Sequence, residues 1–130
     1  MKDLFEDANI IDVYTRKQAI EDGVLVDVSE TAREAGYKYP VAVTHAVWAE
    51  VIVPTEDARK LGQSEEGRLW DVLSVLRHCI VASKGDMQEL LFKVLVAFDG
   101  IKPKPVKLKA VCGPGDQGEP VITIMYPSED

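Results

Sequence analysis

The C-terminal third of the chain, residues 89–126, constrains the fold more than any other segment. Two β-rich runs come first, and a loop at residues 113–120 that contains glycine and proline leads into a third run. In the second run, apolar residues alternate with Lys107 and Lys109, a pattern typical of a strand with one buried and one solvated face. The segment therefore predicts a three-stranded antiparallel meander.

The first strand of this meander, predicted over residues 89–98, is apolar on both faces. Leu91 and Leu95 fall on the face opposite Phe92 and Val94, and only Lys93 interrupts their side. Successive side chains of a strand point to opposite faces of the sheet. A strand that is apolar on both faces predicts a central position or cover from two sides.

The residues before the meander predict helices. Five side chains stand where a helix N-cap is expected: Thr15, Ser29, Thr44, Thr55 and Ser64. Gln18 follows Thr15 by three positions, which completes a capping box. Pro40 disfavours helix before it and predicts extended chain around residues 37–43.

The longest helix is predicted over about residues 64–84, with Gly85 as its stop signal. Its apolar positions recur at helical spacing and comprise Leu69, Trp70, Leu73, Leu76, Cys79 and Ile80. Trp70, and Trp48 on the helix predicted after Thr44, are expected in the core.

Helices followed by a meander predict the α+β class. We expect short helices and one long amphipathic helix packed on an antiparallel sheet. The length of 130 residues predicts one globular domain over residues 1–130. Residues 1–9 are polar and acidic and are expected to form a loosely ordered terminus.

Charge and cysteine content narrow the function classes. The net charge of −7 argues against a generally basic nucleic-acid-binding protein, because phosphate contacts need clustered Lys and Arg. The first residues lack the apolar core of a signal peptide, and no apolar run is long enough to cross a membrane. The two cysteines, Cys79 and Cys112, are too few for a disulfide scaffold. We expect a bacterial cytoplasmic protein with reduced thiols and no membrane contact.

The glycine-rich loop is the first candidate for a ligand site. Backbone N–H groups in such loops can bind anions, and Gly113, Gly115, Asp116 and Gly118 are the candidate residues. Arginine side chains suit a phosphorylated or carboxylated ligand, and the candidates are Arg16, Arg33 and Arg68. The simpler interpretation is a hairpin loop whose glycines adopt positive φ.

The sequence supports a catalytic or metal site less than it supports a ligand site. His45 and His78 are the only histidines, and neither falls in a metal-ligand spacing such as HExxH. An enzyme would need one of them to meet Asp27, Glu30 or Asp116 in a cleft. We therefore predict no catalytic residue, no metal and no cofactor, and an enzyme is the least favoured class.

The only basic cluster comprises Lys102, Lys104, Lys107 and Lys109. It could contact an acidic partner, or it could keep an exposed sheet face and edge soluble. Edge strands in so small a sheet also favour a homodimer through a sheet edge.

Several stretches resemble a family of small bacterial proteins, a domain of unknown function carried on plasmids, phages and integrated mobile elements. They are YTRKQAIEDGVLVDV at residues 14–28, YPVAVT at 39–44, AVWA at 46–49, GRLWDVL at 67–73 and GPGDQGEPVITIM at 113–125. The resemblance implies no activity. It implies an accessory protein of a mobile element, and the expected function is binding of a macromolecular partner, a host or element-encoded protein. The alternative is a small-molecule or nucleotide-type ligand bound by the 113–118 loop and the arginines.

Overall fold

A computed structural model describes residues 14–83 and 88–129 of the chain. The predicted loose terminus at residues 1–9 and the predicted helix stop at Gly85 lie outside the described residues. The helices are α2 (Arg16–Glu21), α3 (Ser29–Glu34), α4 (His45–Val47), the π-helix η1 (Trp48–Ile52), α5 (Glu56–Lys60) and α6 (Glu65–Ala82). The strands are β1 (Leu25–Asp27), β2 (Val41–Thr44), β3 (Glu89–Val96), β4 (Lys104–Pro114) and β5 (Pro120–Met125).

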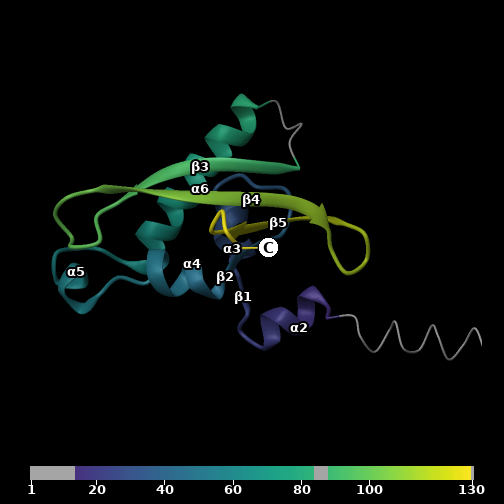
Figure 1. Ribbon diagram of the computed structural model, residues 1–130, viewed down its shortest axis with the longest axis horizontal. Coiled ribbons are helices and arrows are strands. Elements are labelled where there is room, and N and C mark those ends of the chain that lie inside the picture. Colours follow the sequence, from purple (N-terminus) through teal and green to yellow (C-terminus); the bar gives the residue numbers. More distant parts are fainter. Residues whose placement is uncertain (1–13, 84–87, 130) are drawn as a thin grey trace, which may run out of the picture.

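The strands form one sheet in the order β1-β2-β5-β4-β3 (Figure 1). β3, β4 and β5 pair antiparallel with their neighbours in sequence, so the predicted C-terminal meander and the α+β class are confirmed. The sheet is mixed and not fully antiparallel, because β2 lies parallel to β5. Parallel neighbours need a long crossover, and here the crossover contains α4, η1, α5, α6 and two strands of the meander.

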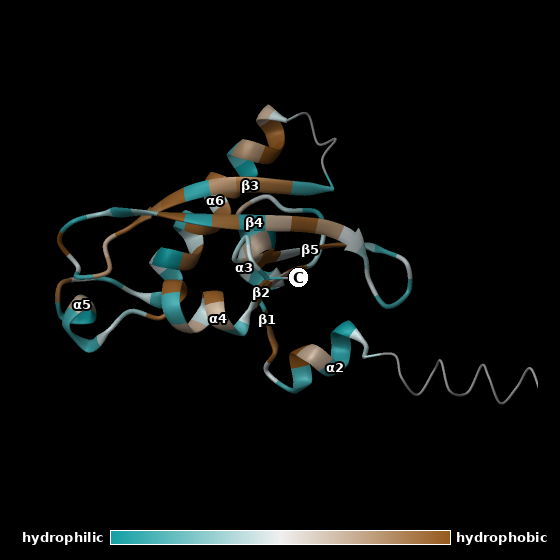
Figure 2. Cartoon of the chain, in the orientation of Figure 1, coloured by the Kyte–Doolittle hydropathy of each residue, from teal (hydrophilic) through white to brown (hydrophobic). Residues whose placement is uncertain are grey.

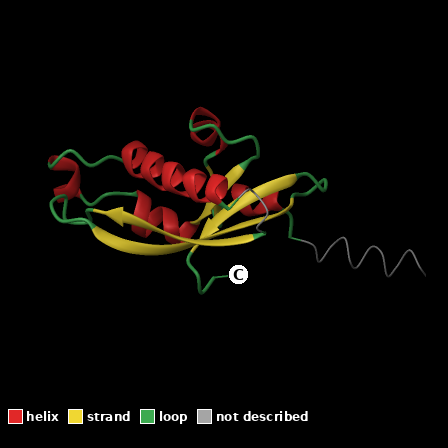
Figure 3. Ribbon diagram, turned by 90° about the horizontal axis from the view of Figure 1, so that it is seen from above, coloured by secondary structure: helices red, strands yellow, loops and turns green. Residues whose placement is uncertain are grey.

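The helices α4 and α6 cover one face of the sheet (Figure 3), and the core lies between the two layers. On this covered face the register places Val41 beside Ile122 and Val43 beside Ile124, all of them buried. Leu76 of α6 and Leu108 of β4 belong to the same core. None of the helices in the described part of the chain is long and apolar enough to cross a membrane.

The long helix α6 begins as predicted, with the Ser64 hydroxyl accepting a hydrogen bond from the Gly67 N–H. Its buried residues include Leu69, Leu73 and Leu76, which confirms most of the apolar stripe. The prediction for Trp70 is wrong, since its side chain is 44% exposed, whereas Arg68 is only 4% exposed. Trp48 is half-buried against the core.

The predicted N-caps at Thr15, Thr44 and Thr55 are confirmed by side-chain hydrogen bonds to the first turns of their helices, and Thr15 and Gln18 form the predicted capping box. The prediction for Ser29 is wrong. Its hydroxyl donates to Asp27 Oδ1 at 2.6 Å and accepts from the Val41 N–H at 3.0 Å. Ser29 therefore links β1 to β2.

The position of β3 also differs from the prediction. β3 is an edge strand, although Figure 2 shows it hydrophobic along most of its length. One face is buried through Phe92, Val94 and Val96, whereas Leu91 and Leu95 on the other face are 59% and 64% exposed. No described element covers the apolar residues of this second face.

Candidate functional site

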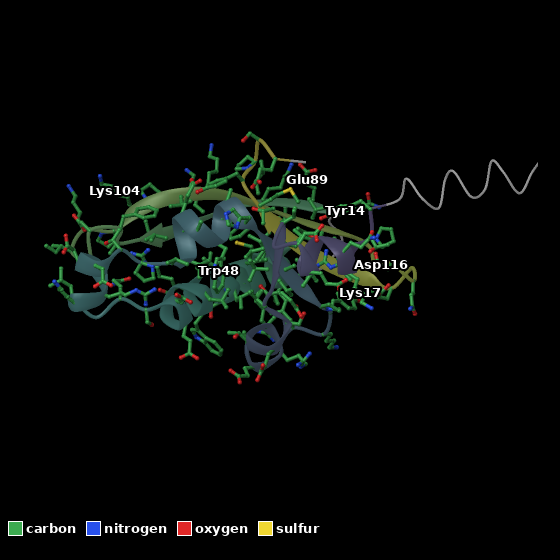
Figure 4. All side chains as sticks on the ribbon, turned by 90° about the horizontal axis from the view of Figure 1, so that it is seen from below. Tyr14, Lys17, Trp48, Glu89, Lys104 and Asp116 are labelled. Atoms are coloured by element: carbon green, nitrogen blue, oxygen red, sulfur yellow. The ribbon has the colours of Figure 1, made fainter. Side chains whose placement is uncertain are left out.

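The structure brings Arg16 and Asp116, two of the predicted ligand-binding residues, together at one end of the molecule. Asp116 Oδ1 accepts from the Arg16 N–H at 2.8 Å, and Oδ2 accepts from the Lys17 N–H at 3.0 Å. These two hydrogen bonds hold the pKa of Asp116 below its ordinary value, because they stabilise the charged form. Figure 4 shows Lys17 and Asp116 side by side. The Asp116 carboxylate thus fixes the start of α2 to the β4–β5 loop.

The Arg16 guanidinium points toward the sheet. It donates to Thr123 Oγ1 at 2.7 Å and to the Ile122 carbonyl at 2.9 Å. Burial lowers the pKa of Arg16, since desolvation disfavours the charged form. Arg16 and Asp116 therefore join α2 to the sheet. The hollow beside them has a volume of about 270 Å³ and is lined by both basic and acidic residues.

The glycine-rich loop is closed by its own hydrogen bonds. The Gly115 N–H donates to the Glu119 carbonyl, and the Gly118 N–H donates to the Gly115 carbonyl. The Gln117 N–H donates to Glu119 Oε1 at 2.9 Å. The backbone donors at residues 115, 117 and 118 are therefore engaged within the loop, and anion binding there remains a prediction.

Only one of the three loop glycines adopts the expected conformation. Gly118 has a φ of +81°, whereas Gly113 and Gly115 do not have positive φ. At Gly115 a Cβ would lie 2.6 Å from the Glu119 carboxylate, which is the end of a flexible side chain and can shift. The expectation of positive φ at the loop glycines is therefore confirmed at Gly118 and wrong at Gly113 and Gly115.

Arg68 does not join this group. Its guanidinium lies in the core and donates to the Val51 carbonyl at 3.3 Å and the Ala97 carbonyl at 3.0 Å. It also donates to Gln63 Oε1 at 3.3 Å and stacks over the Phe98 ring, 5.6 Å from its centre. Burial is the main cause that lowers the pKa of Arg68. These contacts link η1, α6 and the end of β3, which is a structural role.

Arg33 lies with its side chain exposed on α3. The structure thus brings one predicted arginine, Arg16, to Asp116 and the loop, and it places Arg68 in the core. A single arginine pocket built from all three residues does not form, although any ligand role of each residue alone stays a prediction.

The histidines do not form a catalytic group with the described carboxylates. Neither His45 nor His78 is hydrogen-bonded to a carboxylate in the part of the chain that the structure describes. His45 lines a hollow of about 910 Å³ together with Asp22 and Glu129. Among the described residues, no cluster of three or more His, Cys, Asp or Glu could hold a metal ion.

The other face of the sheet carries a surface that the sequence indicated only in part, through Lys107 of the basic cluster. On the β1-β2-β5 half of this face, α2 is attached through Arg16 and Thr123. The C-terminal residues cross it nearby, where Glu129 accepts from the Thr44 hydroxyl at 2.9 Å and, through its carbonyl, from Lys109 Nζ at 2.8 Å. In Figure 1 this face points toward the viewer. The C-terminal residues cover Lys109 of β4, and no other described element lies over the β3–β4 half.

We call this bare surface the β3–β4 patch; it comprises Leu91, Lys93, Leu95, Pro105 and Lys107, all exposed. The register places Lys93 directly opposite Lys107, and Leu95 opposite Pro105. Like charges directly opposite in a sheet are destabilising. The patch therefore combines exposed leucines with an unfavourable pair of positive charges.

The charge around the patch contrasts with that of the whole chain. Residues 89–112, from the start of β3, contain five lysines and two acidic residues, Glu89 and Asp99, a net charge of +3 within a chain of net −7. The rest of the chain therefore carries −10. Figure 4 shows Lys104 and Asp116 at opposite ends of the molecule, so Lys104 lies far from the α2 attachment site. The signal in the sequence was the apolar second face of β3, which predicts a central strand or one covered from two sides.

Comparison with known proteins identifies a family but no activity. The model of the family of unknown function DUF6573 matches residues 1–130, and the chain belongs to this family. Neither the search of curated proteins nor the search of solved structures finds a match.

Proposed function

We propose that this member of DUF6573 is a non-catalytic accessory protein of a mobile genetic element, and that it binds an acidic protein partner through the β3–β4 patch. The observation that carries the proposal is the pair Lys93 and Lys107, which lie directly opposite one another beside the exposed Leu91 and Leu95. A carboxylate from a partner, placed between the two ammonium groups, would relieve their repulsion.

Several features favour a protein partner over nucleic acid. The exposed leucines supply apolar area, and apolar area is a main source of affinity between proteins. The net charge of −7 opposes the approach of a polyanion at long range, whereas a folded protein can present a local acidic group to the patch. The mobile-element setting comes from the sequence resemblance and rests on association alone.

The proposal is tested by site-specific photo-crosslinking in a bacterial host that carries the element. A photoreactive residue at Leu95 or Pro105, which lie beside the lysine pair and leave both lysines in place, is expected to capture the same acidic protein, and one at Arg33, on α3, is expected not to capture it. Leu91→Ser combined with Leu95→Ser should abolish capture from position 105. The matched control is Leu61→Ser, since Leu61 is 56% exposed outside the patch, and it should leave capture unchanged.

Two results would contradict the proposal. One is a set of captured proteins that is the same from positions 95, 105 and 33. The other is tight, salt-sensitive binding of a DNA or RNA oligonucleotide that is lost in Lys93→Glu, because that would assign the patch to phosphate contacts.

A further inference from the structure

No strand in the described part of the chain pairs with the outer edge of β3. The Gln88 carbonyl accepts from the Cys112 N–H at 2.7 Å, and the β3–β4 register continues without a break from Glu89 to Val96. Hydrogen-bonding direction alternates along a strand. The even-numbered residues therefore bond to β4, and Glu89, Leu91, Lys93 and Leu95 direct their N–H and C=O groups outward.

This edge lacks most of the features that normally prevent strands from pairing. β3 is eight residues long and contains neither proline nor glycine, and its regular register shows no bulge. The opposite edge of the sheet, β1, has only three residues. Edge strands are usually protected by shortness, proline, bulges or charge. In β3 only charge remains, as Glu89 and Lys93.

The two charges of β3 are spaced so that the strand complements itself. In an antiparallel pair of two copies, a twofold axis beside Leu91 places Leu91 opposite its own counterpart. In that register Lys93 of each copy lies opposite Glu89 of the other, on the same exposed face. Opposite charges in directly facing positions stabilise paired strands. The three facing pairs, one Leu91–Leu91 pair and two Lys93–Glu89 pairs, are formed by residues whose N–H and C=O groups point outward. Together these pairs allow about six N–H···O bonds.

The competing register is less favourable in charge. An axis beside Lys93 would pair Leu91 with Leu95 of the other copy, but it would also place Lys93 opposite Lys93. Because Lys93 already faces Lys107 within each chain, four ammonium groups would then lie in one row across the sheet. The charge pattern therefore selects the register centred on Leu91.

We infer that the chain forms a homodimer in which β3 pairs antiparallel with β3 of a second copy, with Leu91 at the twofold axis and Lys93 facing Glu89. The two sheets become one continuous sheet, and the side chains of the two β3–β4 patches lie next to each other on one face. This inference concerns the purified protein alone and does not depend on the partner proposed above.

The test is analytical ultracentrifugation of the full-length chain. The wild-type protein is expected to be dimeric at micromolar concentration. Lys93→Glu replaces two attractive pairs with two repulsive ones and should raise the dimer Kd at least tenfold, as should Glu89→Lys. The combined variant Glu89→Lys/Lys93→Glu restores opposite charges and should return the Kd to within about threefold of wild type. Lys107→Glu makes the same charge change one strand away and serves as the matched control.

Two further variants test the edge and the register. Leu91→Pro removes an outward N–H that β4 does not use, and proline is tolerated on edge strands, so this variant should be a folded monomer by circular dichroism. Leu91→Cys should form a disulfide-linked dimer on mild oxidation, because Cα atoms of directly facing residues lie within disulfide range. The wild-type chain, with Cys79 and Cys112, gives the background.

The outcomes separate the inference from its competitor. A wild-type monomer at 100 µM would overturn the dimer and leave Lys93 as a residue that protects the edge from pairing. A dimer that Lys93→Glu does not weaken, or that crosslinks through Lys93→Cys and not through Leu91→Cys, would overturn the proposed register. Failure of partner capture in the host would leave these solution results unchanged.

Discussion

The substitution Arg68→Met tests whether a predicted ligand-binding arginine is instead part of the core. Methionine keeps most of the apolar stem of Arg68 but removes every hydrogen bond of the guanidinium. The carbonyls of Val51 and Ala97 would then lose a charged donor. The Gln63 side chain would also lose its contact with Arg68, and the ring of Phe98 would lose its stacked cation.

The expected magnitude follows from these contacts. Leaving a buried polar group without its partner costs about 1–3 kcal/mol, and a cation over an aromatic ring contributes about 0.5–1 kcal/mol. Removing a buried charge also removes its desolvation cost, which burial of Arg68 makes substantial. The net loss expected for Arg68→Met is about 2–3 kcal/mol in the free energy of unfolding.

The assay is urea unfolding followed by tryptophan fluorescence, since Trp70 lies two residues from Arg68. The urea concentration at the midpoint of unfolding should fall, and the dependence of the unfolding free energy on urea concentration should stay unchanged. This combination indicates lost stability with the same unfolding transition. Arg33→Met is the control, because Arg33 is exposed on α3, and surface substitutions usually change stability by less than about 0.5 kcal/mol. Equal losses in the two variants, or a negligible loss in Arg68→Met, would refute the structural role of Arg68.

The remaining predictions concern the α2 attachment, the core and the β4–β5 loop. The pKa of Asp116 is lowered in the folded protein, so its stabilising hydrogen bonds are complete above its ordinary value and are lost as pH falls through the folded pKa. The NMR shifts of the Arg16 amide should report this acid transition, and Asp116→Asn should remove it. Tyr37→Phe deletes the hydroxyl that donates to the Leu73 carbonyl at 2.7 Å and should cost about 1 kcal/mol, measured by urea unfolding; no loss would contradict the bond. Gly118→Ala introduces a Cβ at a φ of +81° and should cost about 1 kcal/mol, whereas an unchanged thermal midpoint would show that the loop adapts.

Local chemistry explains the elements that could be predicted. Thr15, Thr44 and Thr55 cap helices because a hydroxyl can reach the free N–H groups of the first turn, and these contacts need only the neighbouring residues. Alternation along β4 predicted the buried Leu108 and Ala110 because period-two alternation follows from strand geometry alone. The same pattern placed Lys109 on the solvated face, and this is wrong, since Lys109 is only 9% exposed. Both signals are complete within a few residues of sequence.

The errors arose where the environment of a side chain depends on distant segments. Trp70 and Arg68 lie two positions apart on α6, and the carbonyls of Val51 and Ala97 determined which of them is buried. No local pattern reports that two carbonyls from other segments need a donor. Likewise, Asp116 attaches α2 across about 100 positions of sequence, a relation that exists only once the sheet has formed.

The sequence by itself determined the α+β class, the C-terminal meander and the start of the long helix, because hydrophobic period and capping chemistry are local properties. Only the tertiary structure decided that β2 lies parallel to β5 and that β3 lies at the edge. Strand order depends on which nonlocal contacts bury the most apolar surface together. The apolar residues of a second strand face look the same in the sequence whether another element covers them or they face solvent. For this reason the β3–β4 patch could be recognised only in the folded molecule.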